Sequence, residues 1–146
     1  MKNILMVCVG NICRSPMAEG LLKKYSDEKK INLHVSSAGL SAMLGYSADL
    51  FAVDVMRHRG IDISQHQPRQ VTQEILSAVD LILVMEAWQQ KEIGCLFPSV
   101  YGKVHKLGKW ANFDVPDPYR KSFEHFESTC ALIEKGLLAW EERLWR

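Results

Sequence analysis

Two short and nearly continuous apolar runs constrain the fold more than any other feature of this sequence. One extends from Ile4 to Val7, and the other, Asp-Leu-Ile-Leu-Val-Met, extends from Asp80 to Met85. Apolar runs of this length without polar alternation are typical of strands that are covered on both faces, as in a parallel sheet. Further short strands are expected from Leu33 to Ser37 and from Val104 to Leu107. The sequence therefore predicts a largely parallel, buried sheet.

Apolar residues at helical spacing separate these runs. The patterns predict helices from Pro16 to Lys30, from Ala48 to Arg59, from Thr72 (as cap) through Ser77, from Glu86 to Ile93 with a stop at Gly94, and from Ser122 to Leu144. Ser15 is expected to cap the first helix, and Pro16 suits its first position, where no N–H is needed. Strands that alternate with helices predict an α/β fold of three layers, with helices on both faces of the sheet.

Length and composition exclude several classes of protein. A chain of 146 residues can bury a core without disulfides, so one domain over residues 1–146 is expected. A net charge of +1 lacks the basic excess of nucleic-acid binders. The four cysteines are spaced neither as a disulfide framework nor as a zinc site. The apolar start is too short to insert into a membrane and precedes no cleavage site, which predicts a cytoplasmic protein.

The stretch Cys8-Val9-Gly10-Asn11-Ile12-Cys13-Arg14-Ser15 joins the first strand to the first helix. A loop in this position exposes backbone N–H groups at the positive end of a helix dipole, which makes it a site for an anion. Ligands of parallel sheets bind at the carboxyl ends of strands, and Cys8 is expected at such an end. Gly10 and Asn11 tolerate the left-handed conformations that a tight loop needs.

Cys8 and Arg14 give this loop its chemistry. A cysteine at a strand end and a surface arginine are by themselves ordinary structural residues, but here a strand precedes them and a helix start follows. N–H dipoles and a guanidinium favour a thiolate, which would attack phosphorus as a nucleophile. Arg14 would bind two phosphate oxygens through paired N–H groups. Ser15 can cap the helix, donate its hydroxyl to the sulfur of Cys8, or do both.

Expulsion of a phenolate or alkoxide requires a proton, so an acid is expected opposite the loop. Asp117 is the best candidate, because its segment follows the last strand and reaches the same edge of the sheet. Asp-Pro is also a common start of a turn, and Asp114 is a nearby competitor.

The residues Cys-Val-Gly-Asn-Ile-Cys-Arg-Ser-Pro, followed much later by Asp-Pro-Tyr-Arg, resemble the low-molecular-weight protein tyrosine phosphatases. The similarity covers the whole chain, including Ser36 to Gly39 and Gly60 to Asp62 with His66 and Arg69. It is greatest to the bacterial branch, whose members accompany tyrosine kinases of capsule and exopolysaccharide export.

This resemblance implies a sheet of four parallel strands and a protein-tyrosine phosphatase that needs neither metal nor cofactor. It implies Cys8 as nucleophile, Arg14 as phosphate clamp, and Asp117 as acid and then base. The substrate would be a phosphotyrosine protein, in particular a membrane tyrosine kinase. The residues expected to bind it are Val9, Gly10, Asn11, Ile12, Cys13, Arg14 and Ser15 of the loop, with Leu40, Leu44, Tyr46 and Tyr119 at an apolar rim that suits a phenyl ring.

Three alternatives remain open at this point. Arsenate reductases of this fold need a further cysteine pair, whereas Cys95 stands alone in the corresponding region. Arginine phosphatases of the family carry threonine at the position of Ile12, whose branched apolar side chain narrows the pocket and favours phosphotyrosine. A phosphoprotein-binding module would use the loop without turnover.

The resemblance also suggests a reversible disulfide between Cys13 and Cys8 that protects the nucleophile. A monomer or weak dimer is expected.

Overall fold

Four parallel strands form one sheet at the centre of the molecule. The computed structural model describes residues 1–145, and the strands lie in the order β2-β1-β3-β4. Their bounds are β1 Asn3–Cys8, β2 His34–Gly39, β3 Leu81–Val84 and β4 Val104–Lys106. The helices are α1 Arg14–Lys29, α2 Leu50–Arg57, α3 Gln73–Ser77, α4 Ala87–Leu96 and α5 Phe123–Leu144, with 3-10 turns at Pro98–Lys103 and Lys109–Ala111. The predicted α/β class and four-stranded parallel sheet are confirmed.

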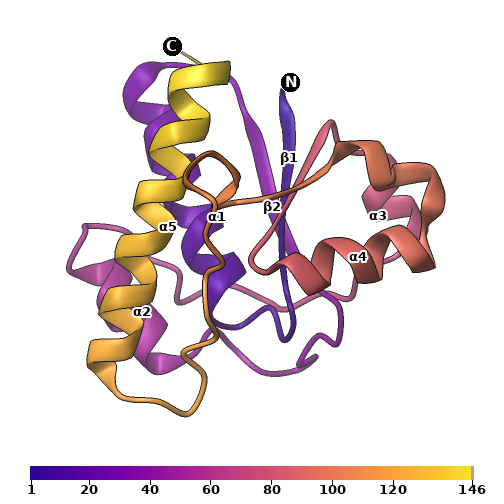
Figure 1. Cartoon of the computed structure of the whole chain (residues 1–146). Coiled ribbons are helices and arrows are strands. Elements are labelled where there is room, and N and C mark those ends of the chain that lie inside the picture. The colour runs from indigo at the N-terminus through magenta and orange to yellow at the C-terminus, as the bar shows by residue number, and fades with distance from the viewer. Residues whose placement is uncertain (146) are drawn as a thin grey trace.

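Helices cover both faces of the sheet. In Figure 1, α1, α2 and α5 lie on one side and α3 and α4 on the other. Alternate residues of the central strand enter the two cores: Ile4 and Met6 pack toward α1, α2 and α5, while Leu5 and Val7 pack toward α3 and α4. All four side chains are fully buried. The continuous apolar run is thus explained, because both of its faces are covered.

The strand order reverses beside β1. The chain pairs β1 first with β2 on one side and then, after a crossover, with β3 on the other. The carboxyl ends of β1 and β3 therefore diverge into different connections, which leaves a crevice between them. The loop after Cys8 lies at this point.

Several helix boundaries differ from the expectation, and α2, at Leu50–Arg57, is shorter at both ends than the expected Ala48 to Arg59. Helix α1 begins at Arg14 and has no side-chain cap, so Ser15 lies inside the first turn, where its hydroxyl makes other bonds. Gly94 does not end α4, which continues to Leu96; the ring of Tyr101 packs where a Cβ of residue 94 would stand, so this glycine serves packing. Thr72 caps α3 as predicted, accepting from the N–H of Ile75 at 3.2 Å. Within residues 1–145, no helix is both long and apolar enough to cross a membrane.

Glu141 on α5 gives the fold a dependence on pH. It faces α1 in a groove that also contains Tyr25. Burial, reinforced by Glu142 and opposed by Lys29, raises the pKa of Glu141 to about 7. This value lies above the 4.5 of an unperturbed glutamate, so ionisation of Glu141 reduces stability as pH rises from about 4.5 to about 7.

We expect Glu141→Gln to raise the free energy of unfolding near pH 8 by about 1 kcal/mol, since the carboxyl is partly solvated. The gain should largely vanish near pH 5, where folded wild-type Glu141 already holds its proton. Thermal unfolding of both proteins at the two pH values measures this difference. Equal gains at both pH values would mean that the charge of Glu141 has no part in the effect.

Candidate active site

The loop between β1 and α1 lies at the carboxyl end of the central strand. It turns sharply at Asn11, a fully buried residue with a left-handed φ of 59°. Three groups hold Asn11 in this conformation. The N–H of Arg69 donates to its Oδ1 at 3.0 Å, His66 Nε2 donates to its carbonyl at 2.7 Å, and its Nδ2 donates to Ser37 Oγ at 2.9 Å. The loop is therefore fixed before any ligand binds.

The glycines of the site provide space. A Cβ on Gly39, at the end of β2, would stand 2.5 Å from the carbonyl oxygen of Val9, so only glycine lets the two segments pack. Gly10 does not adopt the left-handed conformation expected of it; a Cβ there would lie 3.3 Å from the side chain of Met43. Asn11 alone supplies the left-handed residue within this loop.

Cys8 ends β1 and is buried, with only 3% of its surface exposed. Its Sγ lies 2.9 Å from Ser15 Oγ, within hydrogen-bond distance. Ser15 Oγ also accepts from Asn11 Nδ2 at 2.7 Å. Of the two roles expected for this hydroxyl, the contact with the Cys8 sulfur is present and the helix cap is not.

Arg14 is buried by the elements that follow the neighbouring strand. Its Nη1 donates to Glu86 Oε1 at 2.5 Å and to the carbonyl of Val115 at 2.8 Å. Glu86 lies between β3 and α4, two residues after the end of the strand, so it reaches the crevice from the strand next to β1. These two acceptors engage both N–H groups of Nη1 and fix the plane of the guanidinium, whose Nη2 and Nε carry three further N–H groups.

Asp117 and Asp114 have different surroundings. Asp117 Oδ2 lies 3.7 Å from Arg14 Nη2, and 46% of its side chain is exposed. Its Oδ1 accepts from the N–H of Tyr119 at 3.1 Å, which orients the carboxylate. Asp114 instead accepts from Lys106 Nζ at 2.9 Å. The structure therefore brings Asp117, and not Asp114, to Arg14.

A pocket of about 200 Å³ opens over the sulfur. Its walls are formed by Cys8, Val9, Gly10, Ile12, Cys13, Arg14, Ser41, Met43, Asp117 and Tyr119. Asn11 and Ser15 lie behind these walls, fully buried. Tyr119 is the member of the expected rim that lines the pocket.

The other rim residues lie elsewhere. Leu40 packs into the core beneath α3 and α4. Leu44 and Tyr46 are exposed by 61% and 62% and do not line the pocket. Hydrogen bonds from Ser41 N to Val9 O and from Met43 N to Gly10 O, both 2.9 Å, bring Ser41 and Met43 to the pocket in their place.

Cys13 is the second thiol of the site. Burial, reinforced by Asp49 and Cys8, raises the pKa of Cys13 far above its usual value. Cys13 therefore stays protonated and does not compete with Cys8 as a nucleophile. The redox partnership of Cys13 with Cys8 stays a prediction.

Sequence reasoning missed Glu86, Met43 and Ser37. The sequence did contain a signal for Glu86. This residue comes directly after the second apolar run, and ligands of parallel sheets bind at the carboxyl ends of the strands. No local signal marks Met43 or Ser37, because their roles depend on how the segment after β2 pairs with the loop.

A thiol, a fixed guanidinium and a carboxylate around one small pocket fit the hydrolysis of a phosphate ester, the chemistry of a phosphatase. Comparison with known proteins agrees. The family model for low molecular weight phosphotyrosine protein phosphatases matches residues 3–146. The chain belongs to this family and is a protein-tyrosine phosphatase.

Individual relatives cover nearly the whole chain. It is 47% identical over 143 residues to EpsP of Ralstonia nicotianae, a probable low molecular weight protein-tyrosine-phosphatase, covering 98% of this chain and 96% of that protein. The structure of Vibrio vulnificus Wzb in complex with benzylphosphonate is 38% identical, with a TM-score of 0.92 and coverage of 98% and 99%. The arginine phosphatase YwlE, in a mutant with a phosphorylated active-site serine, is 31% identical, with a TM-score of 0.90 and coverage of 99% and 97%.

Proposed function

We propose that this phosphatase hydrolyses phosphotyrosine through a cysteinyl-phosphate intermediate on Cys8. The observation that carries the proposal is the single pocket in which Cys8, Arg14 and Asp117 meet, with Ser15 Oγ 2.9 Å from the sulfur. The loop from Val9 to Ser15, of which Val9, Gly10, Ile12, Cys13 and Arg14 line the pocket, would bind the phosphoryl oxygens through backbone N–H groups. The phosphorylated active-site serine of the YwlE mutant supports a covalent intermediate in a relative.

In the first step the Cys8 thiolate attacks phosphorus while the bond to the tyrosine oxygen breaks. Asp117 gives its proton to that oxygen, and the phenol leaves. In the second step the Asp117 carboxylate takes a proton from water, the water oxygen attacks phosphorus, and the sulfur leaves as a thiolate. Nη2 and Nε of Arg14 bind the phosphoryl oxygens throughout, because Nη1 is held by Glu86 and Val115.

Ile12 and Tyr119 support a preference for phosphotyrosine. Ile12 is 5% exposed and, with Met43 and Tyr119, gives the pocket apolar walls that suit a flat ring. We further propose a cytoplasmic location and, as target, a membrane tyrosine kinase of exopolysaccharide export. The relatives EpsP and Wzb are both named as protein-tyrosine phosphatases, which supports a target that carries phosphotyrosine.

A denaturing quench during turnover tests the proposal. The protein is mixed in EDTA with a phosphotyrosine peptide, or with a phosphoarginine peptide of the same sequence, and its tryptic peptides are analysed by mass spectrometry. We expect a phosphorylated Cys8 peptide, full activity in EDTA, and turnover of phosphotyrosine about tenfold or more above that of phosphoarginine. Phosphate on another residue would reject the nucleophile, and comparable turnover of the two peptides would reject the specificity.

A further inference from the structure

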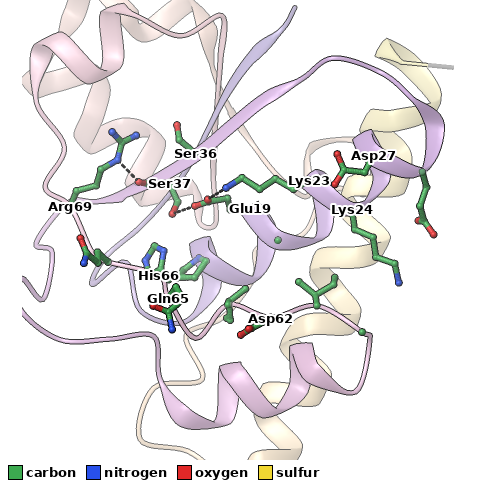
Figure 2. A pocket seen from close by; sticks show the side chains of 17 residues that line it. Glu19, Lys23, Lys24, Asp27, Ser36, Ser37, Asp62, Gln65, His66 and Arg69 are labelled. Atoms are coloured by element: carbon green, nitrogen blue, oxygen red, sulfur yellow. Dashed lines mark hydrogen bonds and ion pairs between the residues drawn. The ribbon is translucent and has the colours of Figure 1, made fainter.

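A second cavity lies behind the loop. This groove of about 680 Å³ runs between α1 and the segment 60–69. Figure 2 shows Glu19 of α1 at its wall, between Ser37 of β2 and Lys23. Lys23 Nζ donates to Glu19 Oε2 at 2.5 Å, and the side chain of Glu19 is 17% exposed. A carboxylate held in this way is oriented toward the interior of the protein.

A chain of hydrogen bonds connects this carboxylate with the sulfur of the proposed nucleophile. Ser37 Oγ donates to Glu19 Oε1 at 2.6 Å, and Asn11 Nδ2 donates to Ser37 Oγ at 2.9 Å. The same nitrogen donates to Ser15 Oγ at 2.7 Å, and Ser15 Oγ lies 2.9 Å from Cys8 Sγ. The chain passes from the groove into the interior, where Asn11 and Ser15 are fully buried.

The numbers of donors and acceptors fix the direction of every bond in this chain. A carboxylate only accepts, so the single proton of Ser37 is committed to Glu19. Ser37 can therefore only accept from Asn11, whose amide presents nitrogen to both serines, the orientation that the N–H of Arg69 at its Oδ1 also requires. Since Ser15 accepts from Asn11, its own proton is left to donate to Cys8. Geometry alone would allow either Ser15 Oγ or Cys8 Sγ to be the donor in their contact. The rest of the chain makes the Ser15 O–H the donor and the sulfur the acceptor, which is the direction that stabilises a thiolate.

We propose that Glu19 is a positioning residue for Cys8, acting through Ser37, Asn11 and Ser15. This inference rests on the proposed function, in which the Cys8 thiolate attacks and later leaves. Without an acceptor at position 19 the Ser37 proton is free to turn toward Asn11, and the amide loses one reason to present nitrogen to Ser15. Lys23 balances the charge of Glu19 in the groove but takes no part in the chain.

Glu19 also joins α1 to β2, so a purely structural role must be separated from a positioning role. The matched set is Glu19→Leu, which removes the acceptor; Glu19→Gln, whose Oε1 still accepts from Ser37; and Lys23→Met, which removes only the ion pair. We expect Glu19→Leu to lower kcat on p-nitrophenyl phosphate about tenfold, because about this much is lost when one hydrogen bond to a charged group is removed. KM should stay within about twofold of the wild-type value. Glu19→Gln and Lys23→Met should keep at least about half of kcat.

Alkylation of Cys8 by iodoacetamide near pH 6, followed by mass spectrometry of its peptide, reads the thiolate without turnover. We expect Glu19→Leu to slow it about tenfold and Glu19→Gln to leave it nearly unchanged. In a Ser15→Ala background, Glu19→Leu should have no further effect, because its influence passes through Ser15.

Additive effects of the two substitutions, or an equal loss in Glu19→Gln and Glu19→Leu, would overturn the positioning role. A loss of thermal stability without a change in kcat or alkylation would leave Glu19 with a structural role only. A wild-type protein that is alkylated as expected but does not hydrolyse the ester would refute the proposed function and not the chain of hydrogen bonds.

Discussion

Replacement of Arg14 by lysine is expected to lower kcat/KM for aryl phosphates about 10³-fold, although the positive charge is kept. Arg14 is 1% exposed and holds Glu86 and the carbonyl of Val115 through one nitrogen, which leaves a planar pair of N–H groups for the phosphate. An ammonium has three donors in a tetrahedral arrangement. It can satisfy the two protein acceptors or bind phosphoryl oxygens bidentately, but it cannot do both.

The matched control is Arg57→Lys. Arg57 lies on α2 and pairs only with Asp54 among the ion pairs of residues 1–145, at 2.9 Å, with 66% of its side chain exposed. Steady-state rates on p-nitrophenyl phosphate should be the same for this variant and the wild type. If Arg14→Lys retains more than about a tenth of the wild-type kcat/KM, charge alone suffices at this position, and the fixed geometry of the guanidinium is not needed.

The local part of the site could be predicted from the sequence because eight consecutive residues carry it. A strand end, a tight loop and a helix start place Cys8 and Arg14 on one loop whatever the rest of the chain does. For Ser15 only the contact with Cys8 was predicted correctly, and the expected helix cap was not. Cap propensity describes a helix end in isolation, whereas here Cys8 and Asn11 engage the hydroxyl and the helix begins at Arg14.

The parts that could not be predicted depend on pairing between distant segments. Glu86 reaches Arg14 because β3 pairs with β1 in a register that ends both strands at the same edge. Met43 lines the pocket because its N–H bonds to Gly10, and Leu40 is turned into the opposite core. Composition and periodicity contain no information on such contacts.

The choice between two carboxylates shows the same limit. Asp114 and Asp117 lie three positions apart on one loop. Lys106, at the end of β4, pairs with Asp114 and removes it from the site. Two residues, Val115 and Pro116, separate Asp114 from Asp117, which lies beside Arg14. Only the relation of the loop to β4 decides between them.

Asp117→Asn is therefore expected to reduce kcat about 10²- to 10³-fold for phenyl phosphate and for phosphotyrosine peptides. Asparagine keeps the size of the side chain and can still accept from the N–H of Tyr119, but it has no proton to give to the departing oxygen. KM should change little, because the contact of Asp117 with Arg14 is long, at 3.7 Å. With p-nitrophenyl phosphate, whose phenolate leaves without full protonation, the loss should be about tenfold or less.

The comparison of the two leaving groups isolates proton donation from every other role of Asp117. Asp114→Asn is the control. The wild-type carboxylate of Asp114 pairs with Lys106 outside the site, so this variant should keep kcat within about twofold for both esters. A loss of the same size for both esters in Asp117→Asn would mean that the carboxylate orients Arg14 and the proton comes from elsewhere. A loss that grows with the basicity of the leaving group ties the proton to Asp117, because only a general acid is needed more as the departing oxygen becomes more basic.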